Sequence, residues 1–210
     1  MRAIVLKLTS AAALLASAMI IALPAQAQAD AILEPIGGKG GSHFVGRCPD
    51  RKYLTGFDLR VGDDIDAIRP LCVTAYGSAK IGAIEPYRFS FGGTGGGGDV
   101  RVMCRNDAPI VAGIRVGFEG VHTQIVNNIH LFCGLAATDH RLAQYPAAVF
   151  DGPPASLPAV GNSGRSNVHQ LNRQNCPPGL VAVGISGRSG VLLDAVGLIC
   201  GPAKLTRITQ

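Results

Sequence analysis

The sequence predicts an all-β fold in which three internal repeats form three sheets. A segment that begins at Cys48 and ends at Cys72 recurs, without a gap, from Cys176 to Cys200. Apolar and polar residues alternate in these segments, as they do in half-buried strands. The chain of 210 residues contains 28 Gly and 13 Pro, a composition typical of many short strands joined by tight turns.

The two matching segments share a Gly-x-x-x-Asp motif and several neighbouring residues. A third, looser copy lies between them, from Cys104 to Cys133. Repetition at this scale indicates one structural unit used three times. The equivalent pairs are Gly56 and Gly184, Arg60 and Arg188, Gly62 and Gly190, Asp66 and Asp194, and Ala67 and Ala195.

Each unit is expected to contain the same elements in the same order. A glycine cluster and a short apolar segment precede the first cysteine, and an alternating run then leads to a turn. In the first unit this run places Phe57, Leu59 and Val61 on one face, with Asp58 and Arg60 on the other. A second apolar run returns to the closing cysteine. The glycine clusters cover residues 37–41, 92–98 and 161–164.

One unit cannot bury its own apolar face, so the three units must pack on one another. We therefore expect a single domain over residues 30–210. The region 136–156 contains prolines and no convincing helix, and is expected to connect the second and third units. The repeats cover about residues 32–80, 83–135 and 157–205.

Residues 1–29 are expected to be a signal peptide. Arg2 and Lys7 precede an apolar run over 11–23, and small residues at alternate positions follow Pro24. This run is shorter than the roughly 20 residues that a spanning helix needs, although a membrane anchor is the alternative interpretation. We expect a secreted or periplasmic protein without a transmembrane segment.

All six cysteines follow the signal region, and an even number in an exported chain indicates disulfides. The repeat selects one of the fifteen possible pairings. Each bridge would then close one unit. Metal binding is the competing hypothesis, but the chain has no Cys-x-x-Cys spacing, so we expect no metal and no cofactor. The expected pairs are Cys48–Cys72, Cys104–Cys133 and Cys176–Cys200.

The charges and the catalytic residue types exclude other classes of function. The formal net charge is +5, two of these charges would leave with the signal peptide, and the basic residues are scattered. Neither nucleic acid nor an anionic surface is therefore an expected partner. The five histidines occupy no repeated position, and no Ser-His-Asp or Cys-His set can be assembled by spacing. We expect a protein that is not an enzyme.

The run from Gly187 to Gly197 resembles the last sugar-binding loop of the jacalin-related lectins, and the glycine clusters resemble the loops that begin their sheets. Three repeats with disulfides are similar to the vitelline-membrane outer-layer protein I group. Both families are β-prism proteins. The resemblance implies a disulfide-stapled β-prism of three Greek-key-like sheets. It covers most of residues 32–205, and is specific in the third unit, fair in the first and weak in the second.

In mannose-type members of the lectin family, the sugar lies between a Gly-x-x-x-Asp loop and the glycine loop of a neighbouring sheet. The aspartate accepts hydrogen bonds from sugar hydroxyls, and loop amides donate others. The second unit has Asn127 near the expected aspartate, and we expect it to have a weak site or none. The resemblance implies one site at Gly190, Val191, Leu192 and Asp194 with Gly41, and another at Gly62, Asp63, Asp64 and Asp66 with Gly96.

The chemistry of these residues suits sugar hydroxyls without an aromatic platform, and the chain has no Trp. Carboxylates are strong acceptors, turn amides are fixed donors, and glycine permits close approach. Three alternatives remain open. In the first, Asp66 and Asp194 are structural turn residues whose side chains bond their own backbone. In the second, Asp63, Asp64 and Asp66 bind calcium. In the third, Arg60 and Arg188 form structural ion pairs with nearby carboxylates.

We therefore expect a carbohydrate-binding, lectin-like module whose partners are glycans or glycoconjugates. Its oligomeric state is open. The paired cysteines are untypical of plant jacalin-type lectins and favour the vitelline-membrane group. The alternatives are a structural envelope or extracellular-matrix-type protein without specific sugar affinity, and a glycan-active enzyme or an inhibitor of one.

Overall fold

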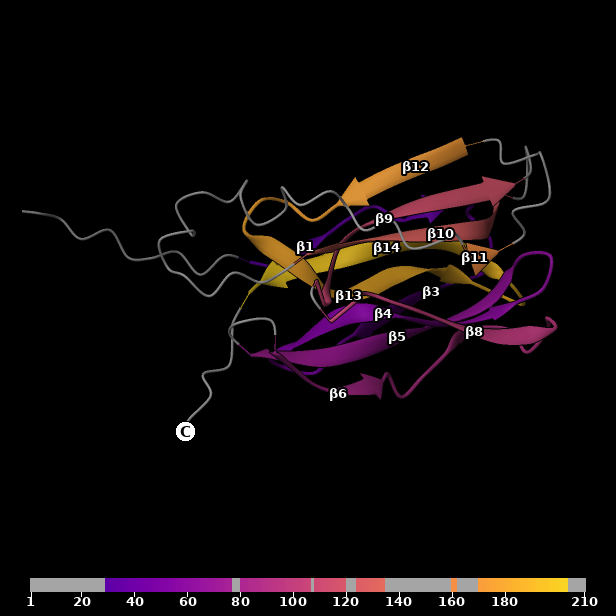
Figure 1. Cartoon of the computed structure of the whole chain (residues 1–210). Coiled ribbons are helices and arrows are strands. Elements are labelled where there is room, and N and C mark those ends of the chain that lie inside the picture. Colours follow the sequence, from indigo (N-terminus) through magenta and orange to yellow (C-terminus); the bar gives the residue numbers. More distant parts are fainter. Residues whose placement is uncertain are drawn as a thin grey trace, which may run out of the picture.

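The computed structural model describes residues 29–76, 80–106, 108–119, 124–134, 160–161 and 170–203. Every regular element in these ranges is a β-strand, and the strands form three antiparallel sheets (Figure 1). The described residues include no helix long and apolar enough to cross a membrane. Residues 1–28 of the expected signal peptide, and the connection over 136–156, lie outside the described residues.

The first sheet is built on the hairpin of the first unit. Its strand order is β6-β5-β4-β8, and β7 also pairs with β5. Its strands are β4 (Lys52–Val61), β5 (Ile65–Tyr76), β6 (Lys80–Pro86), β7 (Phe91–Gly92) and β8 (Gly98–Met103).

The second sheet is built on the hairpin of the second unit, in the order β11-β10-β9-β12. Its strands are β9 (Ile110–Glu119), β10 (Ile125–Gly134), β11 (Val160–Gly161) and β12 (Gln170–Asn175).

The third sheet is built on the hairpin of the third unit, in the order β1-β14-β13-β3, with β2 also paired to β14. Its strands are β1 (Ala31–Ile32), β2 (Ile36–Gly37), β3 (Ser42–Arg47), β13 (Leu180–Ser189) and β14 (Leu193–Pro202).

The three expected sheets are present, but each is shared by two units. The leading strand β8 of the second unit pairs with the hairpin of the first, and β12 of the third unit pairs with the hairpin of the second. The leading strand β3 of the first unit pairs with β13, so the exchange closes into a ring. No sheet is therefore built from one unit alone, because the chain changes sheets at the first cysteine of each unit.

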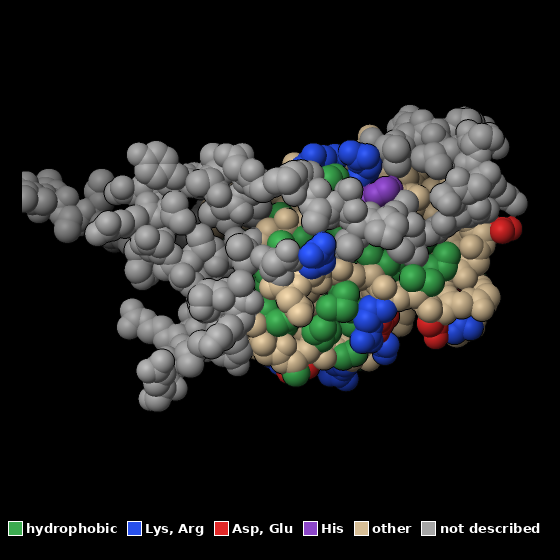
Figure 2. Space-filling model, in the orientation of Figure 1, with side chains coloured by type: hydrophobic (Ala, Val, Ile, Leu, Met, Phe, Trp, Pro, Cys, Tyr) green, Lys and Arg blue, Asp and Glu red, His purple; other side chains and the backbone are tan. Residues whose placement is uncertain are grey.

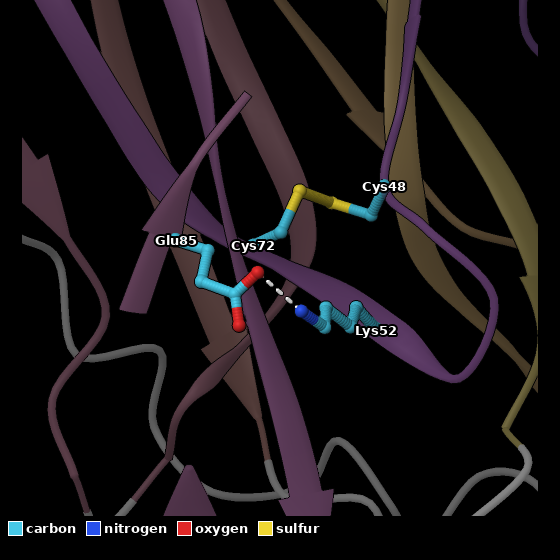
Figure 3. Close-up of a disulfide and its surroundings, with 4 residues drawn as sticks. All are labelled: Cys48, Lys52, Cys72 and Glu85. Carbon is cyan, nitrogen blue, oxygen red and sulfur yellow. Dashed lines mark hydrogen bonds and ion pairs between the residues drawn. A yellow bond between two sulfur atoms is a disulfide. The ribbon is translucent and has the colours of Figure 1, made fainter. Parts of the chain in front are cut away.

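The disulfides are Cys48–Cys72, Cys104–Cys133 and Cys176–Cys200, the three pairs that the repeat predicts. They do not close a unit within one sheet. Cys48 follows β3 of the third sheet and is bonded to Cys72 in β5 of the first sheet, beside the ion pair of Lys52 and Glu85 (Figure 3). The other two disulfides join the first sheet to the second and the second to the third in the same way.

A β-bulge in each hairpin supports the first cysteine of the next unit. The outgoing strand of each hairpin has one extra residue near the closing cysteine. The carbonyl of this residue accepts a hydrogen bond from the N–H of a first cysteine. The bonds run from Cys104 to Thr55 (2.8 Å), from Cys176 to Ala112 (2.9 Å) and from Cys48 to Val183 (2.8 Å).

The core lies between the three sheets. Phe57, Ile114 and Ile185 occupy equivalent positions in the three hairpins, and all three are fully buried in one apolar cluster. Leu59 is buried as well, whereas Asp58 and Arg60 are partly exposed on the other face of β4. The predicted alternation along this strand is therefore confirmed.

The outer face of the first sheet carries an ion-pair network. Asp58 lies opposite Arg69 on β5 and Arg101 on β8, and accepts hydrogen bonds of 2.7 Å from each. Burial raises the pKa of Asp58, but the hydrogen bonds and charges of Arg101 and Arg69 together outweigh it. The pKa of this carboxyl therefore lies below its usual value of 3.8.

Replacing Cys104 and Cys133 with serine should lower the free energy of unfolding by roughly 2–4 kcal/mol, because the denatured chain loses a cross-link. Urea titration of the variant and the wild type measures this difference. Digestion without reduction, followed by mass spectrometry, maps the bridges. A bridge between any other pair of cysteines would contradict the ring of sheets.

Replacing Asp58 with asparagine should remove a pH-dependent part of the stability. A lowered pKa means that the carboxylate stabilises the folded state fully above about pH 5, and that this contribution is lost as the pH falls through about 4 and below. The difference from wild type should be on the order of 1 kcal/mol or less, because both arginines are well exposed. Urea titrations from about pH 6 to 2 test this, and a difference that does not shrink on acidification contradicts it.

Candidate functional site

Asp66 and Asp194 occupy a second set of β-bulges, at the start of the strand that returns from each hairpin turn. Each aspartate is the extra residue at a register shift, in β5 and in β14 respectively. Asn127 is the extra residue at the same place in β10. A bulge re-aims its side chain relative to the regular pleat. The three hairpins therefore present one polar side chain each at equivalent positions.

The turns that precede these aspartates lie at the same end of the molecule as the glycine loops. The N–H of Gly62 donates to the carbonyl of Asp64, and the N–H of Gly190 donates to that of Leu192, both at 2.9 Å. Asp63 and Val191 are exposed at the tips, and Val191 is 80% exposed. Within the described ranges, the aspartates of the first turn do not form a group of three ligands that could hold a metal ion.

The first glycine loop packs directly against Asp194. A Cβ at Gly40 would lie 2.1 Å from Oδ1 of Asp194, and one at Gly41 would lie 2.6 Å from Oδ2. Gly41 also has a φ of +55°, which side chains rarely adopt. Gly190 completes the group, because its Cβ position is 3.6 Å from Cα of Gly41. The structure thus brings together the first set of predicted residues.

The second glycine loop packs against Asp66 in the same way. A Cβ at Gly95 would lie 2.5 Å from Oδ1, and one at Gly96 would lie 2.5 Å from Oδ2. Gly96 has a φ of +80°, and its Cα is 3.2 Å from the Cβ position of Gly62. Sequence reasoning named Gly96 and Gly41 but missed Gly95 and Gly40. The signal was present, because each missed glycine directly precedes a named one.

The recurring arginines hold the glycine loops. Nε of Arg188 donates to the carbonyl of Gly40 at 2.7 Å, and Nη2 donates to that of Gly41 at 2.6 Å. Nε of Arg60 donates to the carbonyl of Gly95. The second unit has Gly117 where the other units have this arginine. Gly117 pairs with Asn128, the residue after the bulge at Asn127, just as Arg60 pairs with Ala67 after the bulge at Asp66. The two arginines therefore position the loops of the first and third units, a role that spacing alone did not reveal.

The aspartate side chains are not used in local turn chemistry. Their backbone carbonyls accept hydrogen bonds from Gly93 (2.9 Å, to Asp66) and Gly38 (2.8 Å, to Asp194). Across the part of the chain that the structure describes, neither carboxylate forms a hydrogen bond or ion pair with the protein. Asp66 is nonetheless only 7% exposed. A carboxylate without a protein partner keeps its acceptor capacity for a ligand.

The two groups of residues are neighbours. A Cβ at Gly93 would lie 2.3 Å from the carbonyl oxygen of Val191, so the second glycine loop touches the tip of the third hairpin. The first glycine loop touches the second hairpin similarly, through Gly38 and Gln124. The remaining parts of a second-unit site, the turn at 120–123 and residues 162–164, lie outside the described residues.

No protein-family model and no curated protein sequence matches the chain. Solved structures of lectins do match. A mannose-binding lectin from Champedak matches with 15% identity and a TM-score of 0.54, over 84% of this chain and 99% of that one. Artocarpin in complex with mannotriose matches with 14% identity and a TM-score of 0.53, over 80% and 95%.

A third match is the lectin of Malaysian banana, with 17% identity and a TM-score of 0.52, over 81% of this chain and 96% of that one. The chain has the β-prism fold of the jacalin-related lectins. Three sheets stapled by three disulfides agree with the fold class that the sequence predicts. At these identities the likeness concerns the fold.

Adjacent glycines allow a sharp test of the glycine-loop geometry. Gly96→Ala should destabilise the protein by roughly 1–3 kcal/mol, because Cβ meets Asp66 and φ is positive. Gly97→Ala is the matched control, since a Cβ there has no heavy atom within 4 Å. It should change stability by about 0.5 kcal/mol or less. Thermal and urea unfolding compare the two variants, and equal effects would contradict the loop geometry.

Proposed function

We propose that the protein is a carbohydrate-binding, lectin-like module that binds glycans or glycoconjugates at two loop sites. The carboxylates of Asp66 and Asp194 carry this proposal. Each has no protein partner in the described residues, and each is enclosed by glycines that leave no room for a side chain. A small ligand rich in hydroxyl groups is the chemistry that such an arrangement suits.

A sugar hydroxyl both donates and accepts hydrogen bonds, and the two sides of each site offer complementary groups. The carboxylate oxygens accept bonds from two neighbouring hydroxyls, and a bond to a charged group contributes about 1.5–3 kcal/mol. Backbone amides of the turn and of Gly41 or Gly96 donate to hydroxyl oxygens. Hydrogen bonds from Arg188 and Arg60 hold the glycine loops beside these carboxylates. Selectivity among sugars then depends on which pairs of neighbouring hydroxyls on the sugar ring can both reach the carboxylate.

The structural neighbours support a mannose-type ligand as the first to test. The Champedak protein is a mannose-binding lectin, and artocarpin was solved with mannotriose. All of the reported neighbours are lectins, which supports a binding role rather than a catalytic one. Each site alone should be weak, with a Kd of about 0.1–1 mM. Because the sites are neighbours, a branched glycan that reaches both gains affinity through effective concentration.

We also place this function outside the cytoplasm. All six cysteines are paired, which is typical of proteins that mature in an oxidising compartment. The signal peptide predicted over residues 1–29 agrees with a secreted or periplasmic protein.

Replacement of the two aspartates tests the proposal. Asp66→Asn and Asp194→Asn preserve the shape of the side chain but remove its charge, so each should lower the affinity of its own site at least about tenfold. Titration calorimetry with mannose and mannotriose, together with a glycan array, measures the loss. Asp50→Asn is the control, because this aspartate is 85% exposed and precedes β4 at the disulfide end.

The outcomes separate the alternatives. Binding that persists in the double variant overturns the two sites. A wild-type protein that binds no glycan on the array overturns the lectin role and favours a structural one. Hydrolysis of an oligosaccharide during the titration identifies an enzyme instead.

A further inference from the structure

Three neighbouring positions on the outer face of each sheet carry different charges in the three units. The central position lies three residues after the bulge whose carbonyl accepts the bond from a cysteine N–H, which is Thr55 in the first unit and Ala112 in the second. The other two positions lie opposite it on the two adjacent strands. In the first sheet these positions hold Arg69, Asp58 and Arg101, so one carboxylate lies between two guanidinium groups. The second sheet holds His130, Arg115 and Arg173 at the equivalent positions.

The second sheet therefore places two arginines directly opposite each other. Like charges in register across neighbouring strands are destabilising. In the described ranges, neither Arg115 nor Arg173 is paired with a carboxylate, and Nε of Arg173 donates only to Oδ1 of Asn175, at 3.1 Å. By contrast, the equivalent Arg101 forms two hydrogen bonds with Asp58. The substitution of aspartate by arginine at the central position leaves a surplus of positive charge.

Phe132 holds the two guanidinium groups in place. Cζ of Arg173 is 3.9 Å from the centroid of the Phe132 ring, and Cζ of Arg115 is 5.6 Å from it. Phe132 is only 7% exposed, so surrounding residues limit its movement. Stacking on an aromatic face is favourable for arginine but neutralises none of its charge. Both guanidinium groups thus lie near one ring. Apart from the bond of Arg173 to Asn175, their N–H groups form no hydrogen bond with the protein in the described ranges.

The cluster is accessible from solvent. Arg173 is exposed and Arg115 is half-buried. Figure 2 shows Lys and Arg side chains gathered over β12, next to a histidine. Both arginines lie within their strands, whereas the glycine loops and aspartates lie at the hairpin ends. This surface is therefore separate from the two loop sites.

We propose that the cluster formed by Arg115, Arg173 and Phe132 binds an anionic group of an acidic polysaccharide, a sulfate ester or a carboxylate. Two fixed guanidinium groups offer planar, paired donors that match such oxyanions. One bound anion also removes the repulsion between the arginines. A polysaccharide fits better than a bilayer, because the cluster lies on a sheet face whose aromatic ring is buried. It fits better than nucleic acid, whose binding needs many basic contacts and not two.

Titration calorimetry with a heparin-type octasaccharide, which carries both sulfate and carboxylate groups, tests the site. Wild type should bind it, and binding should weaken as the salt concentration rises. Arg173→Gln should weaken binding at least about fivefold, and the double variant with Arg115→Gln should abolish it. Arg101→Gln is the matched control, because it removes one charge at the equivalent position of the first sheet. It should change binding less than about twofold.

Removal of two like charges should not lower stability, so urea titration of the double variant shows that lost binding is not unfolding. The variant with Asp66→Asn and Asp194→Asn should bind the octasaccharide as wild type does, which keeps this site distinguishable from the loop sites. Binding that survives the double arginine substitution overturns the proposal. So does equal binding of a neutral dextran octasaccharide, of inorganic sulfate, or of phosphatidylglycerol vesicles.

Discussion

The first cysteine of each unit is the point on which the architecture depends. The N–H of this cysteine donates to a bulge carbonyl in the sheet that contains the strand before the cysteine. Its sulfur forms a disulfide with a cysteine of the next sheet. Three such cysteines close a ring in which no sheet can separate without breaking a covalent bond. Fully buried residues such as Phe57, Ile114 and Ile185 then fill the space between the sheets. The ring explains how a chain with few aromatic residues keeps three hairpins in register.

The ring also determines where chemistry is possible. The glycine loops of the first and second units each belong to the sheet of the preceding unit. Each of these two loops therefore meets a hairpin from another unit. Asp194 is enclosed by Gly40 and Gly41, which are far from it in the sequence. Arg188 uses its guanidinium on the loop carbonyls and not on Asp194, so the carboxylate keeps its acceptors. In each proposed loop site, an arginine holds the glycine loop, and the aspartate has no protein partner among the described residues.

The equivalent central positions on the outer faces of the three sheets hold residues of different charge. Asp58, Arg115 and Ser186 occupy one equivalent position with a negative, a positive and a neutral side chain. The first sheet uses this position for an internal ion pair. The second sheet presents surplus charge to the solvent. One backbone design therefore supports different outer surfaces around a shared apolar core.

The strands of the hairpins and the three cysteine pairs could be predicted from the sequence. They follow from spacing within one unit and from its recurrence, which are local properties of the chain. The family resemblance added Gly41, Gly96, Asp66 and Asp194, but not Gly40 and Gly95. Only the folded chain shows that the sheets are shared between units, that Arg60 and Arg188 hold the loops, and that Arg115 faces Arg173. Charges that look scattered along the sequence become neighbours only through the pairing of strands. Pairing depends on the packing of all three units together, which no single segment encodes.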